Sequence, residues 1–573
     1  MRKQTKLAVV VSAAALVAIG ASMTAMAASG WQQENGQWVY LNSNGDYVYD
    51  EWKRSGDNYF YLGSDGYMVT DSLIDDNGNY YYVDANGAMV KNDWKPVAAD
   101  DSENADIDHR WYYFGPTGRA YRSTTGFVKK TIEGKKYAFN QEGKMLYGWV
   151  TETGDELNTD YDNPCLEADY YFGPNDTTTI NGVTYVGGAM HTGWYEYLDG
   201  IDQYADEGKN IIWFYFNPSN GKKVVSDEKK IGNYYYYFDA NGVMASGWTT
   251  VASGTGSSYA TANKYFSGED EGWRQRNTWV WAVPSSSINE TDNQEGNYRW
   301  FYVGSNGKPV ADQAKKINGK WYVFDGDGIM KSGLVILENG DSAQPLKAIS
   351  SKAHYTGSID AEQTDGAAFT GDPSLMSANP AEYDGQAIYY FGNDEETDGS
   401  MKTGTNVQIE LADGTYTFGF ASSGRAYDGV NKSKLYRNGV LLTGGDSRYA
   451  VKYDYSGDST TNKNYGAAYV VGPTGTFAGN NSSVRDTDDN FYVSVGGYVF
   501  FIESSDYASR FATAIRTMGT RDTATGYTWK NDGLYIKIDG EDVKVEAECL
   551  GRTQHNDTLK SKVKQFYVPA ELQ

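Results

Sequence analysis

The sequence predicts an all-β fold, an elongated, solenoid-like array of stacked β-hairpin repeats with a divergent β-rich region toward the C-terminal end. Three observations predict it. A motif recurs every 21 residues without gaps near the start of the chain, each copy contains a short aromatic run, and each run is followed by a glycine-containing turn. A unit of this length cannot bury its second face alone, so neighbouring units must stack.

The repeat is clearest in three consecutive copies, WVYLNSNG at 38–45, YFYLGSDG at 59–66 and YYYVDANG at 80–87. Side chains of a strand alternate between its faces, so the first and third residues of each run face one way and the second and fourth the other. The second and fourth positions, such as Tyr112 and Phe114, are predicted as core. The N-G or D-G pair that follows each run accepts positive φ, which predicts a tight turn and a two-stranded ribbon.

The chain is predicted to begin with a secretory signal. Basic residues precede an apolar run at 7–19, and Ala25, Met26 and Ala27 supply the small-x-small pattern of a cleavage site. We therefore expect secretion, and no membrane span after cleavage of the signal.

Changes in the repeat pattern predict five regions along the chain. They are the signal peptide at 1–27, regular repeats at 28–95, longer irregular repeats at 96–338, a linker or insertion at 339–384, and a divergent repeat-like β region at 385–573. Within the last region, 505–518 carries a weak helical pattern.

Composition narrows the class of partner. The chain contains 49 Tyr and 15 Trp, and rings presented in such numbers bind sugars or cations. The formal net charge of −25 predicts that polyanions are repelled, so nucleic acid is not an expected partner. The sequence leaves the oligomeric state open.

The repeats resemble the choline-binding or cell-wall-binding repeats of Gram-positive surface proteins, and the related glucan-binding repeats of secreted glucosyltransferases. The family motif, G-W, about seven residues, then W-Y-Y-x-x-x-x-G-x-M, is nearly complete in SGWQQENGQWVYLNSNG at 29–45. The resemblance is good from Gly30 to Gly333 and thin beyond. Its terminal methionine recurs as Met68, Met89, Met145, Met190, Met244 and Met330.

The resemblance implies that the hairpins wind into a left-handed superhelix, with ligand sites between successive hairpins. Each site would be formed by the Trp of the G-W element and by the aromatic residues at positions one and three. Carried over to this sequence, the candidate ligand-binding residues are Trp31, Trp38, Tyr40, Trp52, Tyr59, Tyr61, Tyr80, Tyr82, Trp94, Trp111, Tyr113, Trp149, Trp194, Trp213, Tyr215, Tyr235, Tyr237, Trp248, Trp300 and Tyr302.

Some repeats depart from this pattern. Leu73 replaces a Trp, and Lys136 with Ala138 replaces the outward aromatic pair, so sites beside them are doubtful. The rings at positions one and three also have an alternative role, because they can pack between repeats instead of binding a ligand.

No catalytic residue, metal site or cofactor is predicted. Acidic clusters such as Asp325 with Asp327 lack the spacing of a calcium loop, and Cys549 near His555 is interpreted as an inert thiol beside a surface histidine. An enzyme is not expected.

The sequence favours a non-catalytic protein that attaches to the cell wall of a Gram-positive bacterium through aromatic cages. The partner would be a wall polymer, either choline-substituted teichoic acid or wall glycan, since the same ring faces suit a quaternary ammonium or a sugar. The alternatives are an extracellular glucan or glycan adhesin and, less favoured, a secreted wall hydrolase with its catalytic domain within 341–573.

Overall fold

A computed structural model describes residues 29–572 of the chain, apart from 100–106, 158–161, 181–182, 198–200, 202–203, 205–210, 252–262, 269, 340–345, 347, 371–385, 393–397, 446–447, 458, 461, 481, 518–522, 525 and 553–560. The predicted signal peptide and His555 lie outside the described residues. The chain divides into two compact units, one formed by 1–247 with 267–273 and the other by 248–266 with 274–573.

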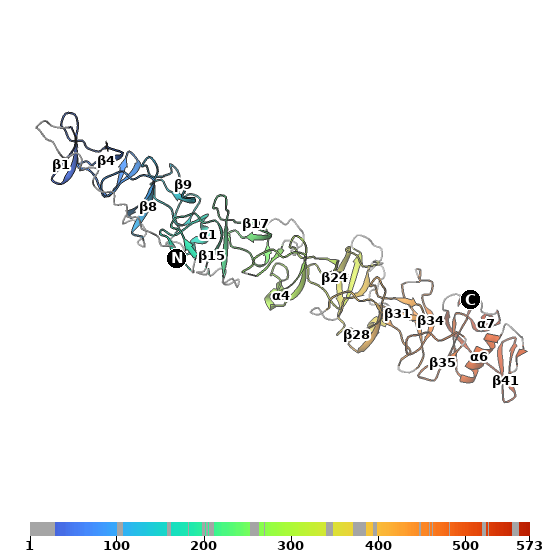
Figure 1. Cartoon of the computed structure of the whole chain (residues 1–573). Helices are drawn as coiled ribbons and strands as arrows, with labels where there is room; N and C mark the ends of the chain where they lie inside the picture. The colour runs from blue at the N-terminus through green and yellow to red at the C-terminus, as the bar shows by residue number, and fades with distance from the viewer. Residues whose placement is uncertain are drawn as a thin grey trace, which may run out of the picture. The chain divides into compact units, whose positions relative to one another are not determined.

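The first unit is a succession of two-stranded antiparallel hairpins, which follow one another in chain order in Figure 1. They pair β1 (Gly30–Glu34) with β2 (Gln37–Leu41), β3 (Glu51–Ser55) with β4 (Asn58–Leu62), β5 (Ser72–Asp76) with β6 (Asn79–Val83), β7 (Asp93–Ala98) with β8 (His109–Phe114), β9 (Val128–Ile132) with β10 (Lys135–Phe139), β11 (Gly148–Val150) with β12 (Tyr170–Phe172), β13 (Thr178–Ile180) with β14 (Val183–Tyr185), β15 (Gly193–Tyr197) with β16 (Ile212–Phe216), and β17 (Asp227–Ile231) with β18 (Tyr234–Phe238). The short helix α1 (Pro164–Glu167) lies between β11 and β12.

The second unit begins with hairpins and continues into larger sheets. Its hairpins pair β19 (Gly247–Thr250) with β20 (Asn263–Phe266), β21 (Thr278–Ala282) with β22 (Arg299–Val303), β23 (Gln313–Ile317) with β24 (Lys320–Phe324), and β33 (Ala450–Asp454) with β34 (Ala467–Val471). A three-stranded sheet has the order β26 (Ala353–Ile359), β25 (Leu334–Asn339), β27 (Ala387–Tyr390), and a five-stranded sheet the order β28 (Gly404–Leu411), β29 (Gly414–Phe420), β32 (Val440–Leu441), β31 (Lys434–Arg437), β30 (Gly429–Asn431). The helices α4 (Glu290–Glu295) and α5 (Gly366–Thr370) are short.

The hairpin loop precedes the aromatic strand. In the first hairpin Glu34 pairs with Gln37, and the two loop residues Asn35 and Gly36 have φ of 51° and 86°. Positive φ at both central residues is the type I′ turn that matches the twist of a two-residue hairpin. The tight turn predicted at the N-G pair after the aromatic run is also present, since the amide of Gly45, with φ of 83°, donates to the carbonyl of Asn42 at 3.0 Å. That second turn does not close the two-stranded ribbon but leads the chain toward the neighbouring hairpin.

The predicted alternation is confirmed in β2 and at the core positions of β8, but it is wrong for β6, where Tyr81, Tyr82 and Val83 are all buried. In β2, Val39 and Leu41 are buried while Trp38 and Tyr40 are only partly covered. Tyr112 and Phe114 of β8 are 4% and 0% exposed, as their core positions predict. The core of the repeat region is therefore a series of small clusters, each shared by consecutive hairpins.

Backbone hydrogen bonds stack each hairpin on the one before it. The amide of Met68 donates to the carbonyl of Trp38, and that of Met89 to the carbonyl of Tyr59, both at 2.8 Å. In each case the methionine follows the aromatic strand of one hairpin, and the acceptor is at position one of the preceding aromatic strand. The step between repeats is thus fixed by main-chain geometry.

The methionine side chain also packs against the turn that follows the next hairpin. Gly87, in the turn after β6, has φ of +77°, and a Cβ added there would lie 2.7 Å from the Met68 Cε. Both the backbone conformation and the close approach of Met68 require glycine at this position. Gly118 receives Met89 in the same way.

The described part of 339–384, predicted as a linker or insertion, includes regular structure. Strand β26 pairs with β25, and the two share a register from Leu334 with Ile359 to Asn339 with Ala353. Residues 353–359 of this segment therefore extend the sheet that begins with β25.

The region predicted as divergent repeat-like β, 385–573, divides into two parts. The repeat skeleton persists to Val471, which bridges to Phe477. Beyond it, two four-stranded sheets and two helices surround a core that includes Val493, Phe511 and Leu534. The elements of this C-terminal part are β35 (Ser483–Arg485), β36 (Phe491–Val495), β37 (Tyr498–Ile502), α6 (Ser505–Thr517), β38 (Thr523–Ala524), β39 (Tyr527–Lys530), β40 (Gly533–Ile538), β41 (Glu541–Lys544), β42 (Glu548–Arg552), α7 (Ser561–Tyr567) and the 3-10 turn η3 (Ala570–Leu572).

The helix predicted weakly at 505–518 is present as α6. Its buried residues Ala508, Phe511 and Ile515 lie on one face, at the spacing expected of an amphipathic helix. Among the described residues, no helix is long and apolar enough to span a bilayer.

Candidate functional site

Three constellations of aromatic residues recur with nearly the same geometry. In each, the Trp of the first strand of a hairpin meets a second Trp at position one of the paired strand, and the two rings are close to perpendicular. The ring centroids are 6.5 Å apart at 84° for Trp94 with Trp111, 6.2 Å at 89° for Trp194 with Trp213, and 6.1 Å at 88° for Trp279 with Trp300.

The next hairpin closes each constellation with a tyrosine and a methionine. The ring centroids of Tyr137, Tyr236 and Tyr322 lie 4.9, 4.8 and 4.8 Å from those of Trp94, Trp194 and Trp279, respectively. The amides of Met145, Met244 and Met330 donate to the carbonyls of Trp111, Trp213 and Trp300 at 2.8, 2.9 and 2.8 Å. We name these sites the Trp111 cage, the Trp213 cage and the Trp300 cage.

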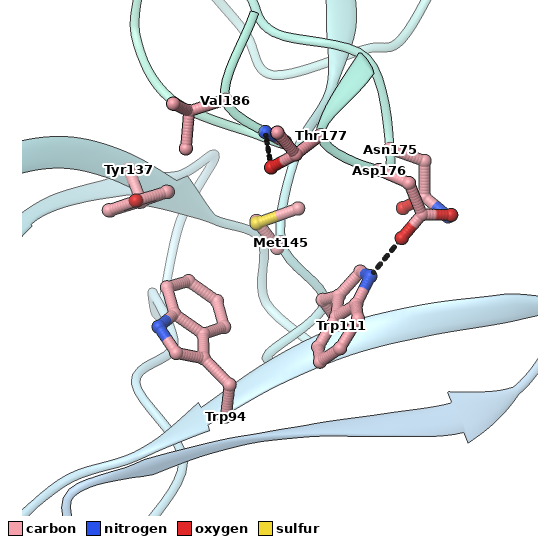
Figure 2. Close-up of a pocket in the computed structure, with 9 residues that line it drawn as sticks. Trp94, Trp111, Tyr137, Met145, Asn175, Asp176, Thr177 and Val186 are labelled. Atoms are coloured by element: carbon pink, nitrogen blue, oxygen red, sulfur yellow. Dashed lines mark hydrogen bonds between the residues drawn. The ribbon is translucent and has the colours of Figure 1, made fainter. Parts of the chain in front are cut away.

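The Trp111 cage borders an open pocket of about 270 Å³. Figure 2 shows Trp94 and Trp111 on one side and Tyr137 with Met145 opposite them, while the segment that carries Asn175, Asp176 and Thr177 closes the remaining side. Burial raises the pKa of Tyr137. Its hydroxyl therefore stays neutral at physiological pH, and the ring remains a neutral wall.

A cage of this kind attracts cations. The face of each ring carries negative electrostatic potential, and a desolvated cation gains about 0.5 to 2 kcal/mol from each face that it meets. The same faces can also pack against the C–H side of a sugar ring. The geometry therefore suits a small ammonium group or a sugar.

Two further sites have a tyrosine at position one and are covered by the chain's own cations. At the Trp52 site, a pocket of about 390 Å³ is lined by Trp52, Tyr59, Tyr81, Met89 and Lys91, and the ammonium of Lys91 lies 4.9 Å from the centroid of the Tyr59 ring. One repeat later, the guanidinium of Arg122 lies 5.8 Å from the centroid of Tyr80.

The two cations occupy equivalent places in the repeat. The amide of Met89 donates to the carbonyl of Tyr59, and the amide of Ala120 donates to the carbonyl of Tyr80. Lys91 follows Met89 by two residues, and Arg122 follows Ala120 by two residues. At the Trp111 and Trp213 cages the equivalent positions hold Tyr147 and Ser246.

The hairpin formed by β9 and β10 lacks both the Trp and the outward aromatic pair, and one of the chain's own lysines lies over a ring there. Lys129 replaces the Trp in β9, and its ammonium lies 3.8 Å from the Tyr170 ring centroid and donates to the carbonyl of Asn220 at 2.8 Å. Burial, together with the nearby charge of Lys136, lowers the pKa of Lys129 to about 8. This is one of the sites predicted from the sequence to be doubtful, and here the chain's own ammonium takes the Trp position.

The predicted residues at position three lie beside the cages, where each is the cross-strand partner of the first Trp. Tyr113 is the cross-strand partner of Trp94, with ring centroids 5.1 Å apart, and Tyr215 is the partner of Trp194 at the same distance. Tyr40, Tyr61 and Tyr302 have the same relation to Trp31, Trp52 and Trp279.

Several other candidates are not brought into a cage. Trp149 is 7% exposed and contacts the rings of five aromatic residues, so its faces are covered by protein. Tyr82 and Tyr237 are buried, and Tyr235 belongs to a hairpin whose Trp position is Glu228. Trp248 contacts Phe301 at 4.8 Å but has Asn263 at position one of its hairpin.

Trp31 has a partial cage. Phe60 of the next hairpin lies 5.4 Å from Trp31, and the amide of Met68 donates to the carbonyl of Trp38. The wall from the next hairpin is therefore a phenylalanine in this case.

Sequence reasoning missed two kinds of residue. Trp279 was missed because it follows Thr278 rather than Gly and lies beyond the regular 21-residue step that identifies Trp52 and Trp94. The available signal was Asn277, which stands two residues before Trp279 as Asp50 and Asn92 stand before Trp52 and Trp94 and, like them, has positive φ. The walls Tyr137, Tyr236 and Tyr322 were missed because position two was assigned to the core of its own hairpin, whereas each cage lies between two hairpins.

Comparison with known proteins agrees with the repeat assignment. The choline-binding repeat model matches residues 50–94, and the cell wall binding repeat model matches residues 29–47, 229–244 and 315–330. Glucosyltransferase-S of Streptococcus mutans is 25% identical over 32% of this chain, and glucosyltransferase-I of Streptococcus downei is 25% identical over 64% of it. The aligned regions span 12% and 24% of those two enzymes.

Solved structures of Streptococcus pneumoniae proteins match as well. CbpJ is 19% identical, with 70% of this chain and 100% of that chain covered and a TM-score of 0.31. The autolysin LytC in complex with a synthetic peptidoglycan ligand is 16% identical, with 56% and 57% covered and a TM-score of 0.30. The matches to the two repeat models confirm the predicted resemblance, and at those residues the chain carries repeats of the choline-binding and cell wall binding family.

Proposed function

We propose that this chain is a non-catalytic secreted protein that attaches to the cell wall by binding choline-like ammonium groups in its Trp cages. The observation that carries the proposal is the threefold recurrence of a perpendicular Trp pair closed by a tyrosine from the next hairpin. Several weak cages on one chain would give avidity for a polymer that presents the same group many times.

The charge of the protein supports a cationic group. A formal net charge of −25 favours the approach of ammonium groups and disfavours free polyanions. The Trp-based cages also have neither Lys nor Arg at the place where Lys91 and Arg122 cover the tyrosine-based sites, so no cation of the chain itself takes that place.

A glucan or another glycan is the second candidate ligand. It is favoured by the similarity to two streptococcal glucosyltransferases, which extends over 64% of this chain in one case. Tryptophan and tyrosine faces suit the C–H face of a sugar, so the same residues would serve either ligand.

The assignment of a non-catalytic role rests on the C-terminal part. Burial raises the pKa of the Cys549 thiol to about 11, so this thiol is protonated and a poor nucleophile at neutral pH. The described residues of this part form a packed core of their own, in which Cys549 is partly buried.

The test is a titration of the full chain with choline and, separately, with a soluble α-glucan, followed by intrinsic Trp fluorescence. Trp111→Ala, Trp213→Ala and Trp300→Ala each remove one cage. Trp273→Ala is the matched control, because Trp273 stacks on Tyr234 outside the three cages.

Saturable quenching by choline that weakens in each cage variant, but not in Trp273→Ala, is the expected result. A response to α-glucan alone would replace the ammonium ligand by a glycan. Turnover of peptidoglycan by the chain would contradict the non-catalytic role.

A further inference from the structure

The Trp111 cage differs from the Trp213 cage by an additional wall. After most aromatic strands a tight turn leads to a bridging residue six positions on, as Phe139 bridges to Met145. Phe172 bridges to Met190, eighteen positions on, and the intervening residues form the extra hairpin β13–β14. Residues 175–177, which lead into β13, and Val186 and Gly187, which follow β14, line the Trp111 cage.

This insertion places a carboxylate in the wall of the cage. Asp176 accepts a hydrogen bond of 3.0 Å from the indole nitrogen of Trp111, 65 positions earlier in the chain. Figure 2 shows the Asp176 side chain above Trp111, at the edge of the pocket. The Asp176 side chain is 60% exposed, so a ligand can approach it.

The insertion itself is held in place. Asn175 is 9% exposed and donates to the carbonyl of His109 at 3.0 Å, and Thr177 accepts a hydrogen bond of 3.0 Å from the amide of Gly187. The Nε2 of His109 lies 3.3 Å from the same Asp176 oxygen. The backbone around Asp176 is therefore held by its two neighbours, and the Trp111 indole fixes the carboxylate itself.

We propose that Asp176 is the residue that makes the Trp111 cage selective for a cationic group over a neutral group of the same shape. The selectivity rests on the proposed function. Ring faces alone bind an ammonium group or a sugar, whereas the Asp176 carboxylate favours the ammonium group at this one site. The pocket of about 270 Å³ lies just below the range of about 300 to 1,000 Å³ typical of sites for drug-sized ligands, so the ligand is a compact head group such as an alkylated ammonium.

Two physical effects support the selectivity. A fixed negative charge beside the rings attracts a cation but does not attract a neutral isostere. This attraction is stronger in a pocket that is partly shielded from solvent than in bulk water. The hydrogen bond also fixes the Trp111 ring before a ligand arrives. In the Trp213 cage, by contrast, the buried indole nitrogen of Trp213 has no hydrogen-bond partner among the described residues.

The experiment uses the full chain labelled with 5-fluorotryptophan and observed by ¹⁹F NMR. The Trp111 and Trp213 signals are assigned with Trp111→Phe and Trp213→Phe. The probes are choline and its neutral carbon isostere 3,3-dimethylbutan-1-ol, titrated at low ionic strength into the unchanged chain and into Asp176→Asn. Asparagine keeps an acceptor for the Trp111 indole and removes only the charge.

The expected result is that Asp176→Asn weakens choline binding at the Trp111 cage about fivefold. Choline binding at the Trp213 cage and the affinity of the Trp111 cage for the isostere should not change, and added salt should reduce the difference. Equal losses for choline and isostere would assign Asp176 a merely structural role and overturn the proposal, as would an unchanged affinity for choline.

The proposed function has a separate outcome in the same experiment. If choline shifts neither the Trp111 nor the Trp213 signal, the ammonium-binding function fails and the selectivity fails with it. If both signals respond to choline but Asp176→Asn has no effect, only the selectivity is overturned.

Discussion

The ammonium of Lys91 lies 4.9 Å from the centroid of the Tyr59 ring, inside a pocket that Trp52 and Tyr81 also line. The chain thus supplies, at this site, the kind of group that the Trp cages are proposed to take from outside. A cation already placed over a ring face occupies that face and repels a second cation.

Lys91→Gln should therefore create an additional choline site. Removal of the ammonium frees the Tyr59 face, and we expect choline affinity at the Trp52 site to rise at least about fivefold, or roughly 1 kcal/mol. Calorimetric titration should show one more site per chain. Arg122→Gln is the matched control, since it removes the equivalent cation beside a repeat that has Leu73 in place of Trp. A gain of equal size in Arg122→Gln would contradict this account.

Trp111 and Trp149 should respond differently to truncation. Trp111→Ala removes one wall of an open cage, so it should abolish binding at that cage with little change in stability. Trp149 is 7% exposed within a packed cluster, and Trp149→Ala should cost about 3 to 5 kcal/mol of unfolding free energy. Urea unfolding and choline titration of both variants test the contrast, and a stability loss in Trp111→Ala as large as that in Trp149→Ala would refute it.

Two glycines separate backbone strain from packing. Gly36 and Gly87 both have positive φ, 86° and 77°, but a Cβ at Gly36 meets nothing within 4 Å, whereas a Cβ at Gly87 meets Met68 at 2.7 Å. We expect Gly36→Ala to cost about 1 to 2 kcal/mol from strain alone and Gly87→Ala to cost a further 1 to 3 kcal/mol from overpacking. Thermal unfolding measures both, and similar losses would show that the contact with Met68 adds nothing.

Tyr567 connects α7 to the neighbouring sheet of the C-terminal part. Its hydroxyl donates to the carbonyl of Val545 at 2.7 Å and accepts from the amide of Leu534 at 2.9 Å. Tyr567→Phe leaves both backbone groups unpaired in a buried place. We expect a loss of about 1 to 3 kcal/mol in the unfolding free energy of this part, measured by urea denaturation at neutral pH.

The same hydroxyl predicts a dependence on alkaline pH. Burial raises the pKa of Tyr567 from its usual 10 to about 12, so the folded state holds this proton more tightly than the unfolded state does. Its contribution is fully present below about pH 10 and is lost as the pH rises toward 12. The stability difference between the unchanged chain and Tyr567→Phe should shrink over that interval, and a constant difference would contradict the prediction.

The sequence predicted the repeat and its local structure because both depend on neighbouring residues. The alternation of Val39 with Tyr40 follows from strand geometry, and the positive φ of Gly36 follows from its place in a two-residue loop. The candidate Trp residues at 94, 111, 194, 213 and 300 were identified from the same local motif.

Contacts between repeats were beyond this reasoning. Tyr137 is a core residue by position in its strand and a cage wall by its place beside Trp94, which only the stacking of two hairpins reveals. Asp176 reaches Trp111 from an insertion within 96–338, where the sequence predicts only longer, irregular repeats. The core from Val493 to Leu534 was missed because its strands and its helix acquire a shared interior only in three dimensions.

The hydrogen bonds from Met68 to Trp38 and from Met89 to Tyr59 have an evolutionary consequence. Each joins one hairpin only to the hairpin before it, through main-chain atoms that every residue other than proline possesses. An in-frame duplication or deletion of whole repeats therefore leaves the remaining joints intact. Recombination can therefore change the number of repeats, and with it the number of cages, without altering the residues of any single pocket.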